Sequence, residues 1–146
     1  MPDPPAMTAA QDERGMRILH TILAVGVALV IAVFILLLRL VGPYVPAGSA
    51  RPIVAYVSSA FGGAAILSAL LAFRPLARGR LRAAPAEHPW TNATRGPAIL
   101  VWLVAESGAI VSSLGLLLTG SMLPAAVAAL GFVTLLWCSP GRLSPP

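Results

Sequence analysis

The sequence predicts an all-α, polytopic membrane protein with four transmembrane helices arranged as two helical hairpins. Hydrophobic residues make up 58% of its 146 residues and charged residues 10%, whereas a soluble domain typically has about 25% charged residues. The apolar residues also fall into four long blocks rather than into short amphipathic ones. Because a chain of this length allows one domain, we treat residues 1–146 as a single membrane domain.

The first apolar block follows a polar segment, residues 1–17, which we expect to be a cytoplasmic tail, disordered over its Pro-rich residues 1–13. The block itself, residues 18–38, is long enough at ~1.5 Å per residue to cross a hydrocarbon core ~30 Å thick. It is longer than the apolar core of a typical signal peptide, so we expect a retained helix. A signal sequence cleaved near Ala50 is the alternative.

The second block, residues 53–73, has many small residues in its middle. Pairs four residues apart, such as Ser58 and Gly62, would let another helix approach closely. A basic cytoplasmic loop is expected next, over residues 74–97, because this stretch has five arginines and four prolines.

Two further blocks, residues 98–118 and 122–138, complete the four predicted helices. The Thr-Gly-Ser sequence between them, residues 119–121, predicts a tight turn. Pro124 is compatible with a helix because it falls in the first turn of the last block. That block is only about long enough to span a bilayer.

The placement of arginine predicts the orientation in the membrane. One side of the predicted topology, which includes both termini and the central loop, has eight arginines, and the opposite side has Arg39 and Arg51. Positive charge collects on the cytoplasmic side, so we expect a multi-pass protein of the inner (plasma) membrane with both termini in the cytoplasm. Near the cytoplasmic interface we expect His20 and a belt of tryptophans: Trp90, Trp102 and Trp137.

The formal charge of +5 is explained by arginines beside the membrane, so we expect no nucleic-acid partner. The expected partners are the lipid bilayer and, at the central loop, anionic lipid. A single cysteine, Cys138, excludes an internal disulfide and a cysteine-based metal cluster, and we expect no cofactor or metal. No catalytic motif is present, so we do not expect an enzyme. The arginines expected to contact anionic lipid are Arg74, Arg78, Arg80 and Arg82.

Glu106 is the candidate functional residue, because it lies near the middle of the third block. A carboxylate at the centre of a membrane helix costs roughly 2.5–3.5 kcal/mol on insertion scales, so such residues are rare and usually functional. No arginine lies at the same depth, and an acid without a cationic partner is expected to be neutral at rest. We expect the side chain to point into the bundle, against the small-residue face of the second helix. The supporting small or polar positions are Ser59, Gly63, Ser68, Ala109 and Ser113.

Three roles for Glu106 follow from its chemistry. A protonated carboxyl group can hydrogen-bond a serine or a backbone carbonyl and hold two helices together. It can also bind and release a proton or cation, or contact another subunit or a lipid. The leading interpretation is a small membrane protein of accessory or assembly type. Four helices leave little room for a transport pathway within a single chain, so we expect a homo-oligomer or a partner in a membrane complex. The alternative is a proton- or cation-coupled channel or transporter subunit with Glu106 as the titrating group.

The segment Ala105-Glu106-Ser107-Gly108-Ala109-Ile110-Val111-Ser112 is followed by an aliphatic run, a short break and a final apolar helix. Residues 97–140 thereby resemble the second helical hairpin of small bacterial membrane proteins similar to the c subunit of rotary ATP synthases. In that family a mid-membrane Glu precedes an Ile-Tyr-Gly-Leu stretch. Here Ile110 matches this stretch, Val111 and Ser112 replace Tyr and Gly, and the family's glycine-rich first helix has no counterpart. The resemblance implies that Glu106 is a proton-binding acid.

Overall fold

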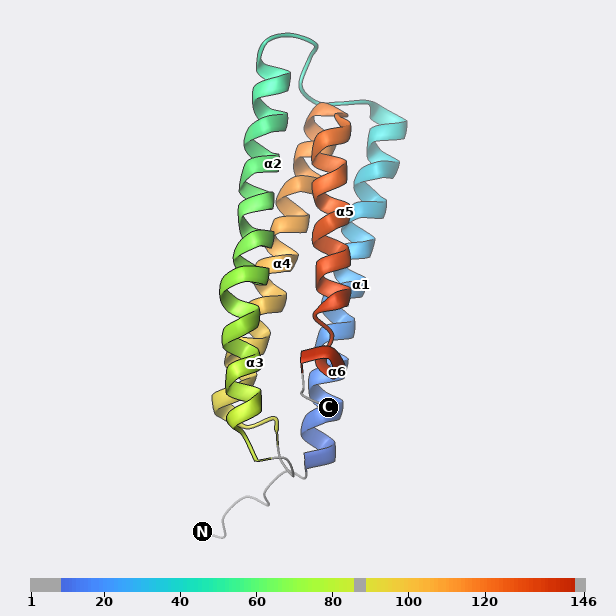
Figure 1. Ribbon diagram of the computed structural model, residues 1–146. Helices are drawn as coiled ribbons and strands as arrows, with labels where there is room; N and C mark the ends of the chain where they lie inside the picture. Colours follow the sequence, from blue (N-terminus) through green and yellow to red (C-terminus); the bar gives the residue numbers. More distant parts are fainter. Residues whose placement is uncertain (1–8, 86–88, 144–146) are drawn as a thin grey trace, which may run out of the picture.

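The chain forms a bundle of helices in the computed structural model, which describes residues 9–85 and 89–143 (Figure 1). The described residues include no strand, which confirms the all-α class. Three helices are long and apolar enough to cross a membrane: α1, the continuous helix Ala50–Ala83, and α4. A further apolar helix, α5, is shorter, with 16 residues. The elements are α1 (Ala9–Val41), α2 (Ala50–Ser68), the π-helical turn η1 (Ala69–Phe73), α3 (Arg74–Ala83), α4 (Asn92–Thr119), α5 (Met122–Trp137) and α6 (Pro140–Leu143).

The long helices run side by side, and α4 is the central one. It packs on α2, α5, α1 and α3, and α2 packs in addition on α5. Figure 1 shows α2 and α1 on opposite sides of α4 and α5, so the first two helices do not pack closely on each other. The expected pair of helical hairpins is therefore correct for α4 and α5, which pack together, and wrong for α1 and α2.

Small residues explain why α2 packs on α4. A Cβ atom added to Gly62 would lie 2.7 Å from the carbonyl oxygen of Gly108, so the two backbones touch at this point. Two turns further along α4, Gly115 makes room for Ser58. The glycines of α1 make no such contact, because a Cβ atom added to Gly15 or Gly26 would meet nothing within 4 Å. The close approach expected at Ser58 and Gly62 is confirmed, and its partner is α4.

The first helix begins earlier than expected. Residues 9–13 are helical, where the sequence predicted part of a disordered tail; residues 1–8 lie outside the described part of the chain. Ala9 and Ala10 favour a helix, and Glu13 accepts a hydrogen bond of 2.6 Å from Arg17 four residues on. Asp12, near the positive end of the helix dipole, also forms an ion pair with Arg95.

The predicted central loop, residues 74–97, is largely helical, and this prediction is wrong. The second helix continues through η1 into α3. Pro75, which has no N–H to donate, lies just after the π-helical turn η1, where the regular α-helical hydrogen bonding is already interrupted. Helix α4 begins at Asn92 because Thr91 forms a capping box: its backbone N–H donates to Oγ1 of Thr94 over 2.9 Å. Residues 84–91 remain as the connection, with residues 86–88 outside the described part.

The turn between α4 and α5 agrees with the sequence. Gly120 ends α4 with a φ of 64°, in the left-handed region that favours glycine, and its N–H donates to the carbonyl of Leu116 over 2.7 Å. Helix α5 then begins at Met122, with Pro124 in its first turn.

The contact of α2 with α4 predicts that Gly62→Ala lowers the stability of the fold by about 1–3 kcal/mol, because the new methyl group forces two backbones apart. Gly63→Ala is the matched control, since a Cβ atom there meets nothing within 4 Å. Thermal unfolding in a mild detergent, followed by tryptophan fluorescence, measures both. An equal shift of the two variants would contradict the close packing.

Candidate functional site

Glu106 lies near the middle of α4 and is only half-buried. Its expected burial inside the bundle is therefore not confirmed. Within residues 9–85 and 89–143 its carboxyl group makes no hydrogen bond and no ion pair. The acid thus lies at the surface of the helix bundle, without a polar partner in the described chain.

The neighbours of α4 explain where Glu106 faces. Helix α2 packs against Gly108 and Gly115, which lie about half a turn around α4 from Glu106 at 3.6 residues per turn. Trp102, one turn before Glu106, contacts His20 of α1, with the ring centroids 5.1 Å apart. Glu106 therefore lies on the side of α4 next to α1, and the expectation that it faces the second helix is wrong.

The expected supporting residues do not gather around the acid. The hydroxyl groups of Ser59, Ser68 and Ser113 donate to carbonyls of their own helices, those of Ala55, Ala64 and Ala109, over 2.7–2.8 Å. Serines in helices often satisfy their hydroxyl groups in this way, and they then have no donor left for a neighbouring helix. A Cβ atom at Gly63 meets nothing within 4 Å, and Ala109 instead packs on Gly131 of α5.

Glu106 borders an exposed strip of α4. Leu103, Ser107 and Leu114 are exposed, and with this spacing they share one face of the helix. Ser107 donates to the carbonyl of Leu103 over 2.7 Å. Ser107 is therefore a polar residue within the exposed strip, and Glu106 lies at the edge of that strip.

His20 forms a second polar cluster, at the end of the bundle where α1 begins and α5 ends. Its Nε2 lies 2.9 Å from the carbonyl oxygen of Leu135, and its ring packs edge-on against Trp102. Nε1 of Trp102 in turn donates to the carbonyl oxygen of Cys138 over 2.6 Å. The cluster joins α1, α4 and the end of α5. Because its residues are far apart in the sequence, the spacing of residues along the chain could not have predicted this cluster.

The expected interfacial belt is only partly present. Trp90 and Trp102 are buried within the protein, as is His20, so these three do not face a membrane interface. Trp137 is exposed, and the guanidinium group of Arg74 lies 5.0 Å from the centroid of its ring. Only Trp137 has the exposure that an interfacial tryptophan needs.

A buried ion pair fastens the start of α1 to the start of α4. The side chain of Asp12 is 3% exposed and pairs with Nη2 of Arg95, whose Nε donates to the carbonyl oxygen of Trp90 over 3.1 Å. Arg95 is thus bound within the protein rather than available to an external partner.

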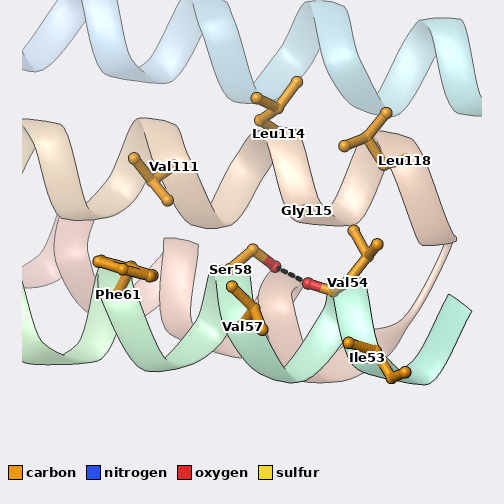
Figure 2. A pocket seen from close by; sticks show the side chains of 9 residues that line it. All are labelled: Ile53, Val54, Val57, Ser58, Phe61, Val111, Leu114, Gly115 and Leu118. Atoms are coloured by element: carbon orange, nitrogen blue, oxygen red, sulfur yellow. Dashed lines mark hydrogen bonds between the residues drawn. The ribbon is translucent and has the colours of Figure 1, made fainter. Parts of the chain in front are cut away.

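A groove of about 440 Å³ lies between α2 and α4, at the far end of the bundle from His20. Figure 2 shows its one hydroxyl group, that of Ser58, turned back onto its own helix, where it donates to the carbonyl of Val54 over 2.8 Å. The groove therefore suits an apolar group and offers no titratable side chain. Its lining residues are Ile53, Val54, Val57, Ser58, Phe61, Val111, Leu114, Gly115 and Leu118.

Comparisons of this chain with family models, with curated proteins and with solved structures find no match. The resemblance of residues 97–140 to the c-subunit-like proteins therefore stays a prediction. Among the described side chains, no group of three His, Cys, Asp or Glu residues lies together as metal ligands would.

The buried ion pair predicts that Asp12→Ala loosens the start of α1 by about 1–3 kcal/mol, because Arg95 is left without its counter-charge. Hydrogen exchange of the amides of residues 9–17 should accelerate accordingly. Glu13→Ala is the control: the Glu13–Arg17 pair is exposed and contributes less than about 1 kcal/mol. Equal acceleration in both variants would show that the buried pair has no special role.

Proposed function

We propose that this chain is a small, non-enzymatic, multi-pass protein of the inner membrane, of accessory or assembly type. In this proposal it crosses the membrane four times, with α5 and its short continuation α6 as the last crossing, and has both termini in the cytoplasm. It acts by associating, through the side of α4 that bears Glu106, with a second membrane polypeptide. That polypeptide is a second copy of the chain or a subunit of a membrane complex.

The position of Glu106 supports this proposal best. A carboxyl group halfway along an apolar helix costs free energy wherever it faces lipid, and hydrogen bonding to a neighbouring helix reduces that cost. The described helices provide no such partner, and the half-exposed carboxyl group borders the strip with Leu103 and Ser107. An external helix on this strip would cover both the apolar surface and the acid.

The alternative is a proton- or cation-coupled channel or transporter subunit, in which Glu106 binds and releases the ion. The same exposure favours it, because an acid at the bundle surface can exchange a proton with an adjoining subunit. The resemblance to c-subunit-like proteins points in the same direction.

The assembly proposal predicts different effects for two substitutions of Glu106. Glu106→Gln keeps a hydrogen-bonding side chain and should preserve association, whereas Glu106→Leu should weaken it about 5- to 30-fold, the effect of losing one interhelical hydrogen bond in a membrane. Energy transfer between two differently labelled copies of the chain in vesicles measures self-association. Co-isolation with a tagged copy from native membranes measures association with other subunits. Leu130→Ala is the control, because Leu130 is exposed on α5, and α5 packs on a different side of α4, at Ala109.

Proton flux in liposomes separates the two functions. If Glu106 is the titrating group, Glu106→Gln abolishes flux because the amide cannot ionise, and a carbodiimide that reacts with protonated acids labels the wild type at this position. Wild-type chains that neither self-associate nor co-isolate with another subunit, together with flux that Gln abolishes, would refute the assembly proposal and favour the alternative.

A further inference from the structure

The face of α3 that follows η1 has three arginines at a spacing of four residues. Arg74, Arg78 and Arg82 recur once per turn and so lie on one side of the helix. They line a groove of about 260 Å³ together with Leu70, Pro75 and Gly79. Arg80 belongs to the same helix but does not line the groove. Of the four arginines that the sequence analysis expected to contact anionic lipid, three therefore line the groove and Arg80 does not.

No carboxylate within the described part of the chain forms an ion pair with the three arginines. Both ion pairs formed among residues 9–85 and 89–143 use other arginines, Arg17 and Arg95. Arg78 donates from Nη2 to the carbonyl oxygen of Arg142 over 2.9 Å, a contact that positions its guanidinium group without neutralising it.

Arg74 is held at one end of the groove. Its guanidinium group lies over the ring of Trp137, and its Nε is buried without a hydrogen-bond partner among the described residues. A buried donor of this kind is stabilised by an acceptor oxygen. Planar guanidinium groups bind phosphate oxygens in pairs, which makes arginine well suited to phosphate recognition.

Apolar surface adjoins the charged groove. Leu67 and Leu71, on the turns before Arg74, are both exposed, and Leu70 forms part of the groove itself. The same helix thus passes from an apolar exposed surface to a row of arginines within a few residues. A ligand with a phosphate group at one end and hydrocarbon at the other matches both parts.

We propose that the groove of Arg74, Arg78 and Arg82 is a binding site for the phosphate group of an anionic phospholipid. The acyl chains lie along Leu67 and Leu71. One lipid binds per chain, and this binding is independent of any role of Glu106. The site differs from a diffuse basic surface, because it requires the arginines that line the groove and not their neighbour Arg80.

The test uses the purified full-length chain in a neutral detergent, titrated with phosphatidylglycerol and followed by native mass spectrometry. One phosphatidylglycerol molecule should bind per chain in preference to phosphatidylcholine. Arg82→Gln should weaken this binding about fivefold, the effect of one arginine near anionic lipid, whereas Arg80→Gln should change it less than about twofold. Both arginines are exposed and both variants lose one charge, so the pair is matched.

Arg82→Lys separates charge from geometry, since it keeps the charge and loses the planar fork, and should give an intermediate affinity. Equal losses for Arg82→Gln and Arg80→Gln would overturn the proposal in favour of diffuse attraction. Equal binding of the two lipids would overturn it as well. Displacement of phosphatidylglycerol by an equal concentration of inorganic phosphate would identify a site for free phosphate instead. Circular dichroism of each variant confirms that the comparison is between folded chains.

Discussion

The contact between the backbones of α2 and α4 determines how the other helices are placed. Gly62 and Gly108 bring the two helices so close that no side chain fits between them. Helix α5 packs on an adjoining side of α4, where Gly131 contacts Ala109. Helix α1 packs on the side of α4 that bears Trp102, which contacts His20. Glu106 is left at the edge of the remaining exposed strip. The position of the acid is therefore a consequence of where the glycines lie on α4.

Helix α1 is attached differently from the others. Its buried residues end at Val27, and beyond that point the helix is largely exposed. Polar contacts hold its first half: Asp12 to Arg95, and His20 to the carbonyl of Leu135. At the far end, the loop after α1 is tied to α4 by a hydrogen bond of 2.8 Å from the N–H of Val45 to the carbonyl of Leu118. The exposed apolar surface of α1 is what a helix facing lipid requires.

Hydropathy predicted the helical class and the apolar blocks, and the Thr-Gly-Ser sequence predicted the turn at Gly120, because each of these depends on the local sequence. Hydropathy could not predict the full helix lengths, since a membrane helix can continue into polar sequence, as α3 does through its arginines. We also expected α1 to pack on α2 because the two helices follow each other in the chain. In the structure α2 packs on α4 instead, because Gly108 and Gly115 of α4 allow a close approach. The side of the bundle that Glu106 faces depends on which helices pack against α4. The cluster of His20 and Trp102 depends on contacts between distant parts of the chain. Local sequence patterns indicate neither which helices are neighbours nor which distant residues are in contact.

The central claim is that α2 faces Gly108 of α4 and not Glu106. Paired cysteines test it most directly, in a chain whose native Cys138 is replaced by serine. A Cβ atom at Gly108 would lie 3.3 Å from that of Ala65, close to the separation that a disulfide requires. Mild oxidation in native membranes should therefore link Ala65→Cys with Gly108→Cys and leave Ala65→Cys with Glu106→Cys unlinked. Efficient linkage of positions 65 and 106, with none between 65 and 108, would contradict the account.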